Sequence, residues 1–143
     1  MLVGLALALP PVSTSAQEAK IDAATSAAGT IAVELNRLEP LETGCRLYVV
    51  VDNRTRTPFS TLQLDLVLFR TDGVVDQRFF VDLAPLRKDK RIVKLFEIDN
   101  VKCSDLGSLL VNDVNECRSD KEAVADCLSL LTVSSLAPAK LLK

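Results

Sequence analysis

The stretch Thr61-Leu-Gln-Leu-Asp-Leu-Val-Leu-Phe69 decides the fold, because every second residue from Leu62 to Leu68 is a leucine. Polar residues occupy most of the positions between the leucines. Successive side chains of a β-strand point to opposite faces of a sheet, so this period of two predicts a strand with one buried face. The leucine face then needs a second layer to cover it.

The same period of two recurs before and after this stretch, with turn residues between the repeats. It predicts five further strands, at residues 31–36, 45–53, 74–83, 92–98 and 108–114. The connections are too short for the helices that link parallel strands. The 143 residues are therefore predicted to form one all-β domain, an antiparallel β-sandwich.

The strand predicted at 92–98 departs from simple alternation. Val93 and Leu95 point to one face, whereas Phe96 and Ile98 point to the other. Two explanations fit this pattern: both faces of the strand are partly covered, or a β-bulge lies near Leu95. The sequence leaves the choice between them open.

Near the C-terminus the pattern becomes helical. Ser119 and Glu122 have the spacing of a capping box, in which each side chain hydrogen-bonds a free backbone N–H at the start of a helix. Apolar residues then recur at helical spacing over 124–131. The pattern predicts a helix over about 120–136, so that residues 118–143 form an appended C-terminal α-helix and tail.

The first sixteen residues have the features of a signal peptide. An apolar run at 2–9 is followed by two prolines and by small residues, with Thr14 and Ala16 at the positions that a signal peptidase recognises. The run is too short to span a bilayer as a helix. No Lys or Arg follows Met1, which departs from the usual pattern. We expect a periplasmic or otherwise exported protein with a signal peptide at 1–16, a spacer at 17–30 and a sandwich at 31–117.

All four cysteines follow the predicted cleavage site: Cys45, Cys103, Cys117 and Cys127. An even number of cysteines in an oxidising compartment predicts two disulfides. A zinc site is disfavoured, because the chain has no C-x-x-C pair and no histidine. Free thiols would be expected only if the chain were not exported.

Five segments between residues 45 and 98 share an order of strands and turns with a known family: Leu47–Asn53, Leu62–Phe69, Thr71–Val75, Leu83–Leu86 and Phe96–Ile98. Together they resemble the FxLYD-type, immunoglobulin-like domains of bacterial envelope proteins. The cysteines and the predicted helix are not part of that pattern. The resemblance implies an immunoglobulin-like sandwich that serves as an extracytoplasmic module, and it carries over no functional residue.

An immunoglobulin-like arrangement bears on how the cysteines pair. In it, the strand that begins at Cys45 pairs antiparallel with the strand that ends near Ile98, so Cys103 can reach Cys45. Cys117 would then pair with Cys127, which requires the chain to fold back along the predicted helix. The main alternative joins Cys103 to Cys117 and links Cys127 to the sandwich.

Composition disfavours several classes of function. The chain has no histidine, which removes His-based acid–base catalysis and imidazole metal sites. It has no tryptophan and one tyrosine, so a stacking platform for nucleic acids is not expected. A net charge of −2 gives no field for nucleic acid or an anionic membrane. We therefore expect no catalytic site, no cofactor, no nucleic-acid partner and only indirect contact with a membrane.

Two surfaces are candidates for contact with a partner protein. The C-terminal leucines could meet a partner, or the whole apolar stripe could pack on the domain itself. The charged turn at 87–91 could contact an acidic or phosphate-bearing partner, or be a solvated hairpin tip. The residues concerned are Leu136, Leu141, Leu142, Arg87, Lys88, Lys90 and Arg91.

Other polar groups are better explained as structure. Asp65, Asp72, Asp76 and Asp82 lack the spacing of a calcium loop and are expected to be surface charges. The polar residues over 112–116 are expected to form a turn.

The sequence thus favours a non-catalytic protein-interaction or assembly module, with a protein of the cell envelope or a second copy of the chain as partner. The alternative is a carrier of a small apolar ligand such as a lipid, held inside the sandwich. It is suggested by apolar residues on the less regular faces: Val50, Val67, Phe69, Val93 and Leu95. A hydrolase that uses acidic residues alone is a third, weaker hypothesis.

Overall fold

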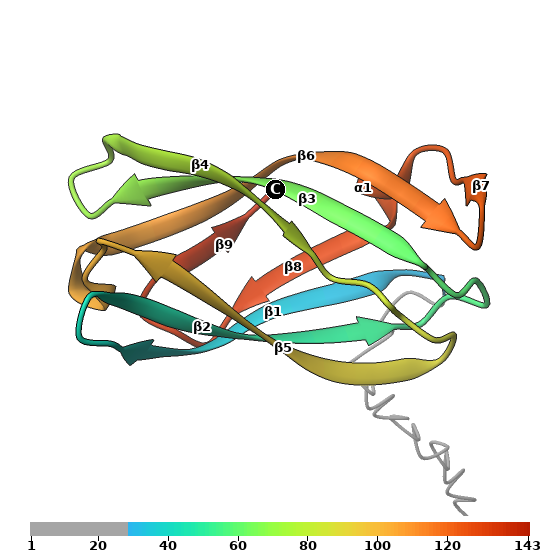
Figure 1. The fold of residues 1–143 in the computed structure, drawn as a ribbon, viewed down its shortest axis with the longest axis horizontal. Helices are drawn as coiled ribbons and strands as arrows, with labels where there is room; N and C mark the ends of the chain where they lie inside the picture. Colours follow the sequence, from blue (N-terminus) through green and yellow to red (C-terminus); the bar gives the residue numbers. More distant parts are fainter. Residues whose placement is uncertain (1–28) are drawn as a thin grey trace, which may run out of the picture.

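A computed structural model describes residues 29–143, which form two β-sheets packed face to face (Figure 1). The predicted signal peptide and nearly all of the predicted spacer lie outside the described residues. Within 29–143, no helix is long and apolar enough to cross a membrane. The two-layered all-β architecture predicted from the alternating apolar residues is confirmed.

The first sheet has four strands in the order β5-β2-β1-β8. Antiparallel pairing joins β1 to β2 and β2 to β5, whereas β8 runs parallel to β1. The strands are β1 (Ile31–Pro40), β2 (Gly44–Asn53), β5 (Lys90–Asp99) and β8 (Leu131–Ser135).

The second sheet has five strands, of which four follow the order β4-β3-β6-β7. The fifth strand, β9, pairs parallel with the first half of β6. The strands are β3 (Thr61–Arg70), β4 (Val75–Asp82), β6 (Leu106–Ser119), β7 (Glu122–Ala123) and β9 (Lys140–Leu142).

The leucines of β3 form the centre of the core, as their spacing predicts. All four are at most 5% exposed, and they face the buried side chains of β1 and β2 in the other sheet. Full burial of one such side chain contributes about 2 kcal/mol relative to its exposed state. The leucines of β3 are Leu62, Leu64, Leu66 and Leu68.

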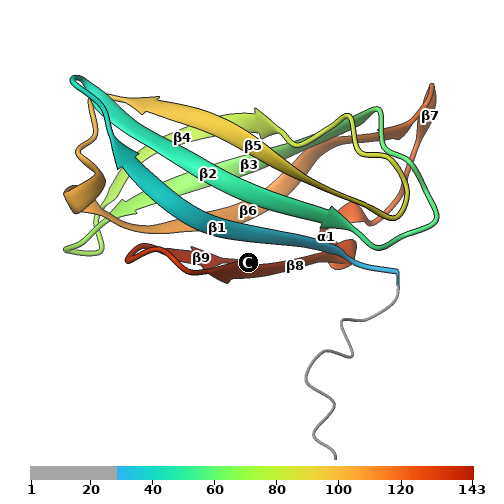
Figure 2. The same cartoon turned by 90° about the horizontal axis from the view of Figure 1, so that it is seen from below.

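The two long sides of the sandwich differ. On one side the chain crosses from β8 in the first sheet to β9 in the second, through residues 136–139. On the other side β4 and β5 are the outermost strands of their sheets. Figure 2 shows β8 and β9 together along one side and β4 and β5 along the other. We call these the closed side and the open side.

The predicted C-terminal helix over 120–136 is corrected by the structure. The only helical part of 118–143 is α1 (Cys127–Leu130), a single turn. Ser119 and Glu122 pair with each other across a two-residue hairpin between β6 and β7, in which Asp120 has a φ of 52°. A capping box and a hairpin of this length share the same three-residue spacing, so the capping-box interpretation is wrong.

The residues after α1 form strands in place of the predicted helix. Leu131 is fully buried next to Ile31, and the β-branched Thr132 and Val133 continue β8 beside β1. β-branched side chains lose rotamer freedom in a helix and fit a pleated strand well. The C-terminal segment is therefore part of both sheets of the sandwich.

The disulfides are Cys45–Cys103 and Cys117–Cys127. Cys45 pairs with Ile98 across β2 and β5, which brings Cys103 within a Cα–Cα distance of 5.0 Å. The second pair has a Cα–Cα distance of 6.5 Å. A helix between Cys117 and Cys127 would have held the two cysteines too far apart. The chain instead turns back through β7, which brings them together.

The strand β5 has no bulge. Its register with β2 is continuous from Gly44 opposite Asp99 to Asn53 opposite Lys90. Neither explanation of its broken alternation holds in full, because Val93 and Leu95 lie uncovered on the outer face and are 55% and 51% exposed.

Candidate interaction surface

The open side of the first sheet ends in a long strand with a free edge. β5 has ten residues and pairs on one side only, with β2. An edge strand presents unpaired backbone N–H and C=O groups, and natural proteins usually protect such edges with short length, proline or charge. On its outer face β5 exposes Val93 and Leu95 between charged residues near its two ends, and Lys94, between them in the sequence, belongs to the inner face.

The exposed residues of β5 continue into an apolar patch on the outer face of the sheet. Val93 lies opposite Val50 in β2, and Leu95 lies opposite Tyr48. Directly opposed side chains on one face are close enough to touch. We call Tyr48, Val50, Val93 and Leu95 the outer patch.

An ion-pair network borders the outer patch at one end. Arg46 donates to Oε1 of Glu97 from Nε at 2.9 Å and from Nη2 at 2.7 Å, and its Nη1 donates to Oε1 of Glu39 at 2.9 Å. The hydroxyl of Tyr48 donates to Oε2 of Glu39 at 2.7 Å. This hydrogen bond, with the charges of Arg46 and Arg37, lowers the pKa of Glu39. The network fixes the Tyr48 ring at the edge of the patch.

A second set of charges borders the opposite end of the patch. Asp52 accepts from Nε of Arg54 at 3.0 Å and lies 3.5 Å from Nη2 of Arg91. Asp52 and Arg91 are paired across β2 and β5. The outer patch is therefore an apolar strip between two rows of charges, an arrangement typical of protein contact surfaces.

Between the free edges of β4 and β5 the open side is hollowed. An open groove of about 300 Å³ is lined by residues 77, 79–81 and 96–99 from the two strands. Phe79 and Phe96 are half-buried there, and Phe80 is 52% exposed on the outer face of the second sheet. Apolar groups thus continue around the open side from one sheet to the other.

The basic turn at 87–91 is positioned by a buried asparagine. Nδ2 of Asn53 donates to the carbonyl oxygens of Thr57 at 2.9 Å and of Arg87 at 3.1 Å, and Oδ1 accepts from the backbone N–H and hydroxyl of Thr55. Asn53 is fully buried, and the sequence prediction missed this role. The turn itself is exposed, with Arg87, Lys88, Lys90 and Arg91 at its surface.

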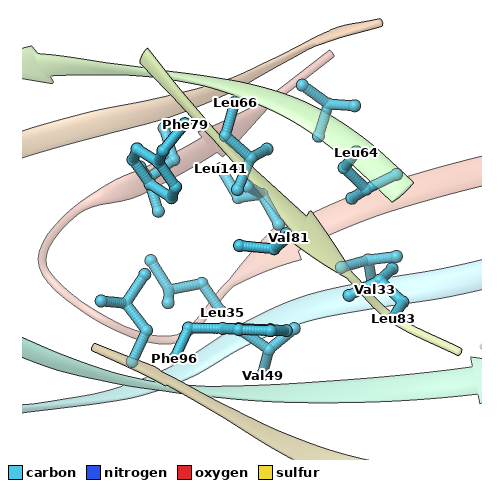
Figure 3. A pocket seen from close by; sticks show the side chains of 13 residues that line it. Val33, Leu35, Val49, Leu64, Leu66, Phe79, Val81, Leu83, Phe96 and Leu141 are labelled. Carbon is cyan, nitrogen blue, oxygen red and sulfur yellow. The ribbon is translucent and has the colours of Figure 1, made fainter. Parts of the chain in front are cut away.

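The C-terminal leucines divide into two groups. Leu136 is 71% exposed and Leu142 is 43% exposed, whereas the side chain of Leu141 points into the core among Leu66 and Val81 (Figure 3). All three belong to the closed side, away from the basic turn at the start of β5. The structure therefore does not join the two predicted contact surfaces into one.

The interior of the sandwich has little free space. The cavity lined by the side chains of Figure 3 has a volume of about 20 Å³, which is room for about one water molecule. An acyl chain does not fit this space, so the interior gives no support to the apolar-ligand hypothesis.

The acidic residues considered for calcium each have separate partners. Nε and Nη2 of Arg78 donate to the two carboxylate oxygens of Asp65, both at 2.7 Å, and Asn112 donates to Oδ2 at 2.7 Å. These hydrogen bonds lower the pKa of Asp65, Arg78 having the largest effect. Asp82 accepts from the backbone N–H groups of Leu62 and Ala84.

The residues at 112–116 were expected to form a turn, but they lie within β6. Asn112 reaches Asp65 from there, and Asn115 donates to Gln63 of the neighbouring strand. Over residues 29–143, His, Cys, Asp and Glu side chains form no group of three that could hold a metal ion. The hydrogen bonds of Asp65, Asn112 and Asn115 tie neighbouring strands together.

Comparison with models of protein families, with curated proteins and with solved structures gives no match for this chain.

Proposed function

We propose that this chain is a non-catalytic protein-interaction module of the cell envelope, and that it binds its partner through the open side. The observation that carries the proposal is the outer patch, where Val93 and Leu95 are each more than half exposed on a strand with a free edge. Apolar groups in such a position are stabilised when a partner covers them.

The free edge of β5 suits the addition of a strand. In β-strand addition, main-chain hydrogen bonds supply affinity, and side chains on alternate positions supply specificity. Val93 and Leu95 hold alternate positions on the outer face, and Ile92 and Phe96 hold them on the inner face. A strand added to β5 would contact apolar groups on both faces of the extended sheet.

An exported location is part of the proposal. Two disulfides among the described residues are compatible with an oxidising compartment, since thiols stay reduced in the cytosol. The predicted signal peptide at 1–16 supports the same location. We also propose that the sandwich is of the immunoglobulin-like, FxLYD type, a relation supported by the two-layered fold and by the segments that suggested it.

Two lysine substitutions of leucine test the proposed surface. Leu95→Lys places a charge in the outer patch, and Leu136→Lys places the same charge at an exposed position of the closed side. The full chain is purified from its native envelope after mild cross-linking, and the attached proteins are quantified by mass spectrometry. We expect Leu95→Lys to weaken binding about tenfold, the equivalent of about 1.4 kcal/mol, and Leu136→Lys to leave it unchanged.

The opposite ranking would contradict the proposal, because it would place the contact on the C-terminal leucines. Equal retention of the partner by both variants would contradict it as well. Circular dichroism of both variants checks that the sandwich still forms.

A further inference from the structure

We propose that the partner of β5 is the β5 strand of a second copy of this chain, paired antiparallel about a twofold axis at Lys94. The two four-stranded sheets would then form one continuous sheet across the dimer. This inference rests on the proposed function and specifies the partner.

The order of charges along β5 favours pairing with itself in the antiparallel sense. Basic residues lie in the first half of the strand, at Lys90, Arg91 and Lys94, and acidic residues lie at its end, at Glu97 and Asp99. Antiparallel pairing of two copies places the basic half of each strand beside the acidic half of the other. Opposite charges across strands are favourable, and like charges directly opposite are unfavourable.

One register matches charge and apolar side chains together. With Lys94 at the axis, Arg91 of one copy lies opposite Glu97 of the other, and Val93 lies opposite Leu95 on the same outer face. Ile92 lies opposite Phe96 on the inner face. Shifting the register by one residue would place inner-face side chains of one copy beside outer-face side chains of the other. Only registers that differ by an even number of residues keep the two outer faces together.

The neighbouring strands extend this match beyond β5. On the outer face, Glu39, Arg46 and Glu97 form one row of alternating charge across β1, β2 and β5. The second copy would continue that row with its Arg91 and Asp52, which are paired in each chain. Charges would thus alternate across five strands of the joint sheet, and the two outer patches would meet between two such rows.

Two features distinguish β5 from β4, the other edge of the open side. Self-pairing of β4 about Phe79 would place Asp76 opposite Asp82, and self-pairing about Arg78 would place two exposed guanidinium groups together, so like charges repel in both central registers. In β5 the like-charged contact within the strand is Lys94 with its copy, and beyond the strand Asp99 would lie opposite Asp89 of the preceding turn. Nζ of Lys94 donates to the carbonyl oxygen of Ala84 at 2.6 Å, so each ammonium group is held within its own chain.

Charge reversal gives a test that depends on this register. In a homodimer, Arg91→Glu would set two carboxylates against each other at each 91–97 contact, and Glu97→Arg would set two guanidinium groups together. A mixture of the two variants allows heterodimers in which each strand meets a strand of opposite charge. The masses of the purified full chains, alone and mixed, are measured by sedimentation equilibrium. Arg118→Glu and Glu116→Arg, an exposed ion pair on β6, provide the matched control.

We expect the wild type to dimerise, each β5 variant alone to dimerise at least about tenfold more weakly, and their mixture to recover dimers. We expect the control variants to match the wild type, alone and mixed. If the β5 variants fail to fold, Leu95→Lys replaces them, with Leu136→Lys as its control. We expect Leu95→Lys to be monomeric at concentrations where the wild type and Leu136→Lys are dimeric.

A monomeric wild type, or a dimer that none of the β5 substitutions weakens, would overturn the inference. If the wild type is monomeric but Leu95→Lys still abolishes capture of an envelope protein, self-pairing fails and the proposed function stands. If the wild type is monomeric and capture is insensitive to Leu95→Lys, both fail.

Discussion

Asp65 has a buried side chain, although the sequence pattern predicts that it is exposed. It occupies an outward position of β3, yet its side chain is only 3% exposed beneath Arg78 and Asn112. A buried carboxylate that receives three hydrogen bonds contributes to stability, because its desolvation is offset by charge-assisted contacts. Since Arg78 itself is 61% exposed, solvent screening reduces the strength of the ion pair.

We expect Asp65→Asn to lower the free energy of unfolding by about 1–2 kcal/mol. The amide nitrogen would face the donors of Arg78 and Asn112, and the charge that attracts the guanidinium would be lost. Asp76→Asn, at an exposed position of β4, is the matched control and should change stability by less than about 0.5 kcal/mol. Urea unfolding measures both. A change of equal size in the two variants would refute the role assigned to Asp65.

The lowered pKa of Asp65 gives the stability a direction with pH. A carboxyl group whose pKa is lower in the folded state stabilises the fold above its unfolded pKa, about 3.9, and that contribution is lost as pH falls through the folded pKa. The difference in unfolding free energy between wild type and Asp65→Asn should therefore be constant near neutral pH and shrink below about pH 4. A difference that grows on acidification would contradict this assignment.

At the scale of elements, the two disulfides close loops of very different length. Cys45–Cys103 spans 58 residues and ties the start of β2 to the segment before β6, whereas Cys117–Cys127 spans 10 residues around β7. In the chain-entropy model these loops correspond to about 4 and about 3 kcal/mol. Two double variants, each with both cysteines of one disulfide replaced by serine, remove the two loop closures one at a time.

We expect the Cys45→Ser/Cys103→Ser variant to lose more stability than Cys117→Ser/Cys127→Ser. The second variant should keep the β-sandwich spectrum, because β7 and α1 pack at the end of β6 outside the main sheet pairings. Guanidinium unfolding, followed by circular dichroism, measures both. A larger loss on removing the shorter loop would mean that β7 and α1 are integral to the core.

The strands could be predicted from the sequence because each carries its own local signal. Alternating leucines locate β3 without knowledge of any other segment, and the same holds for β2 and most of β5. The C-terminal segment lacks such a signal. β8 pairs parallel with β1, about a hundred residues earlier in the chain, and this distant contact adds to the β-branched Thr132 and Val133 in selecting a strand over a helix.

The proposed contact surface could be predicted from the sequence only at the start of β5, where Lys90 and Arg91 were candidates for contact, and not at Val93 and Leu95. The sequence left open whether the C-terminal leucines are exposed or packed on the domain: Leu136 is exposed, and the partial burial of Leu141 depends on β9 pairing with β6. The broken alternation at Val93 and Leu95 was visible in the sequence, but the sequence does not reveal which strand lies at the edge of a sheet. Because β5 lies at the edge of its sheet, the apolar side chains of Val93 and Leu95 form an exposed surface.

At the scale of the whole molecule, the oxidised state can be read from intact mass. Protein isolated from its native compartment should not react with an alkylating agent, because both disulfides are formed. After reduction it should take up four alkyl groups, one for each cysteine. If the signal peptide is removed as predicted, the measured mass is that of a chain that begins at Gln17. Uptake of four equivalents without reduction would contradict both the disulfides and the exported location.

The proposed contact through the open side, and not through the closed side, can be tested at two positions of the first sheet. Val93 and Ser134 lie in one cross-strand row of the first sheet, through Val50 and Glu34, but at opposite edges. Both are exposed on the same face, so a photo-crosslinking amino acid is accessible to a partner at either position. The variants are irradiated in intact cells, and adducts of higher mass are detected by immunoblot.

We predict abundant adducts from position 93 and none above background from position 134. Adducts from position 134 alone, or equal labelling at the two positions, would contradict the assignment of the open side as the contact surface.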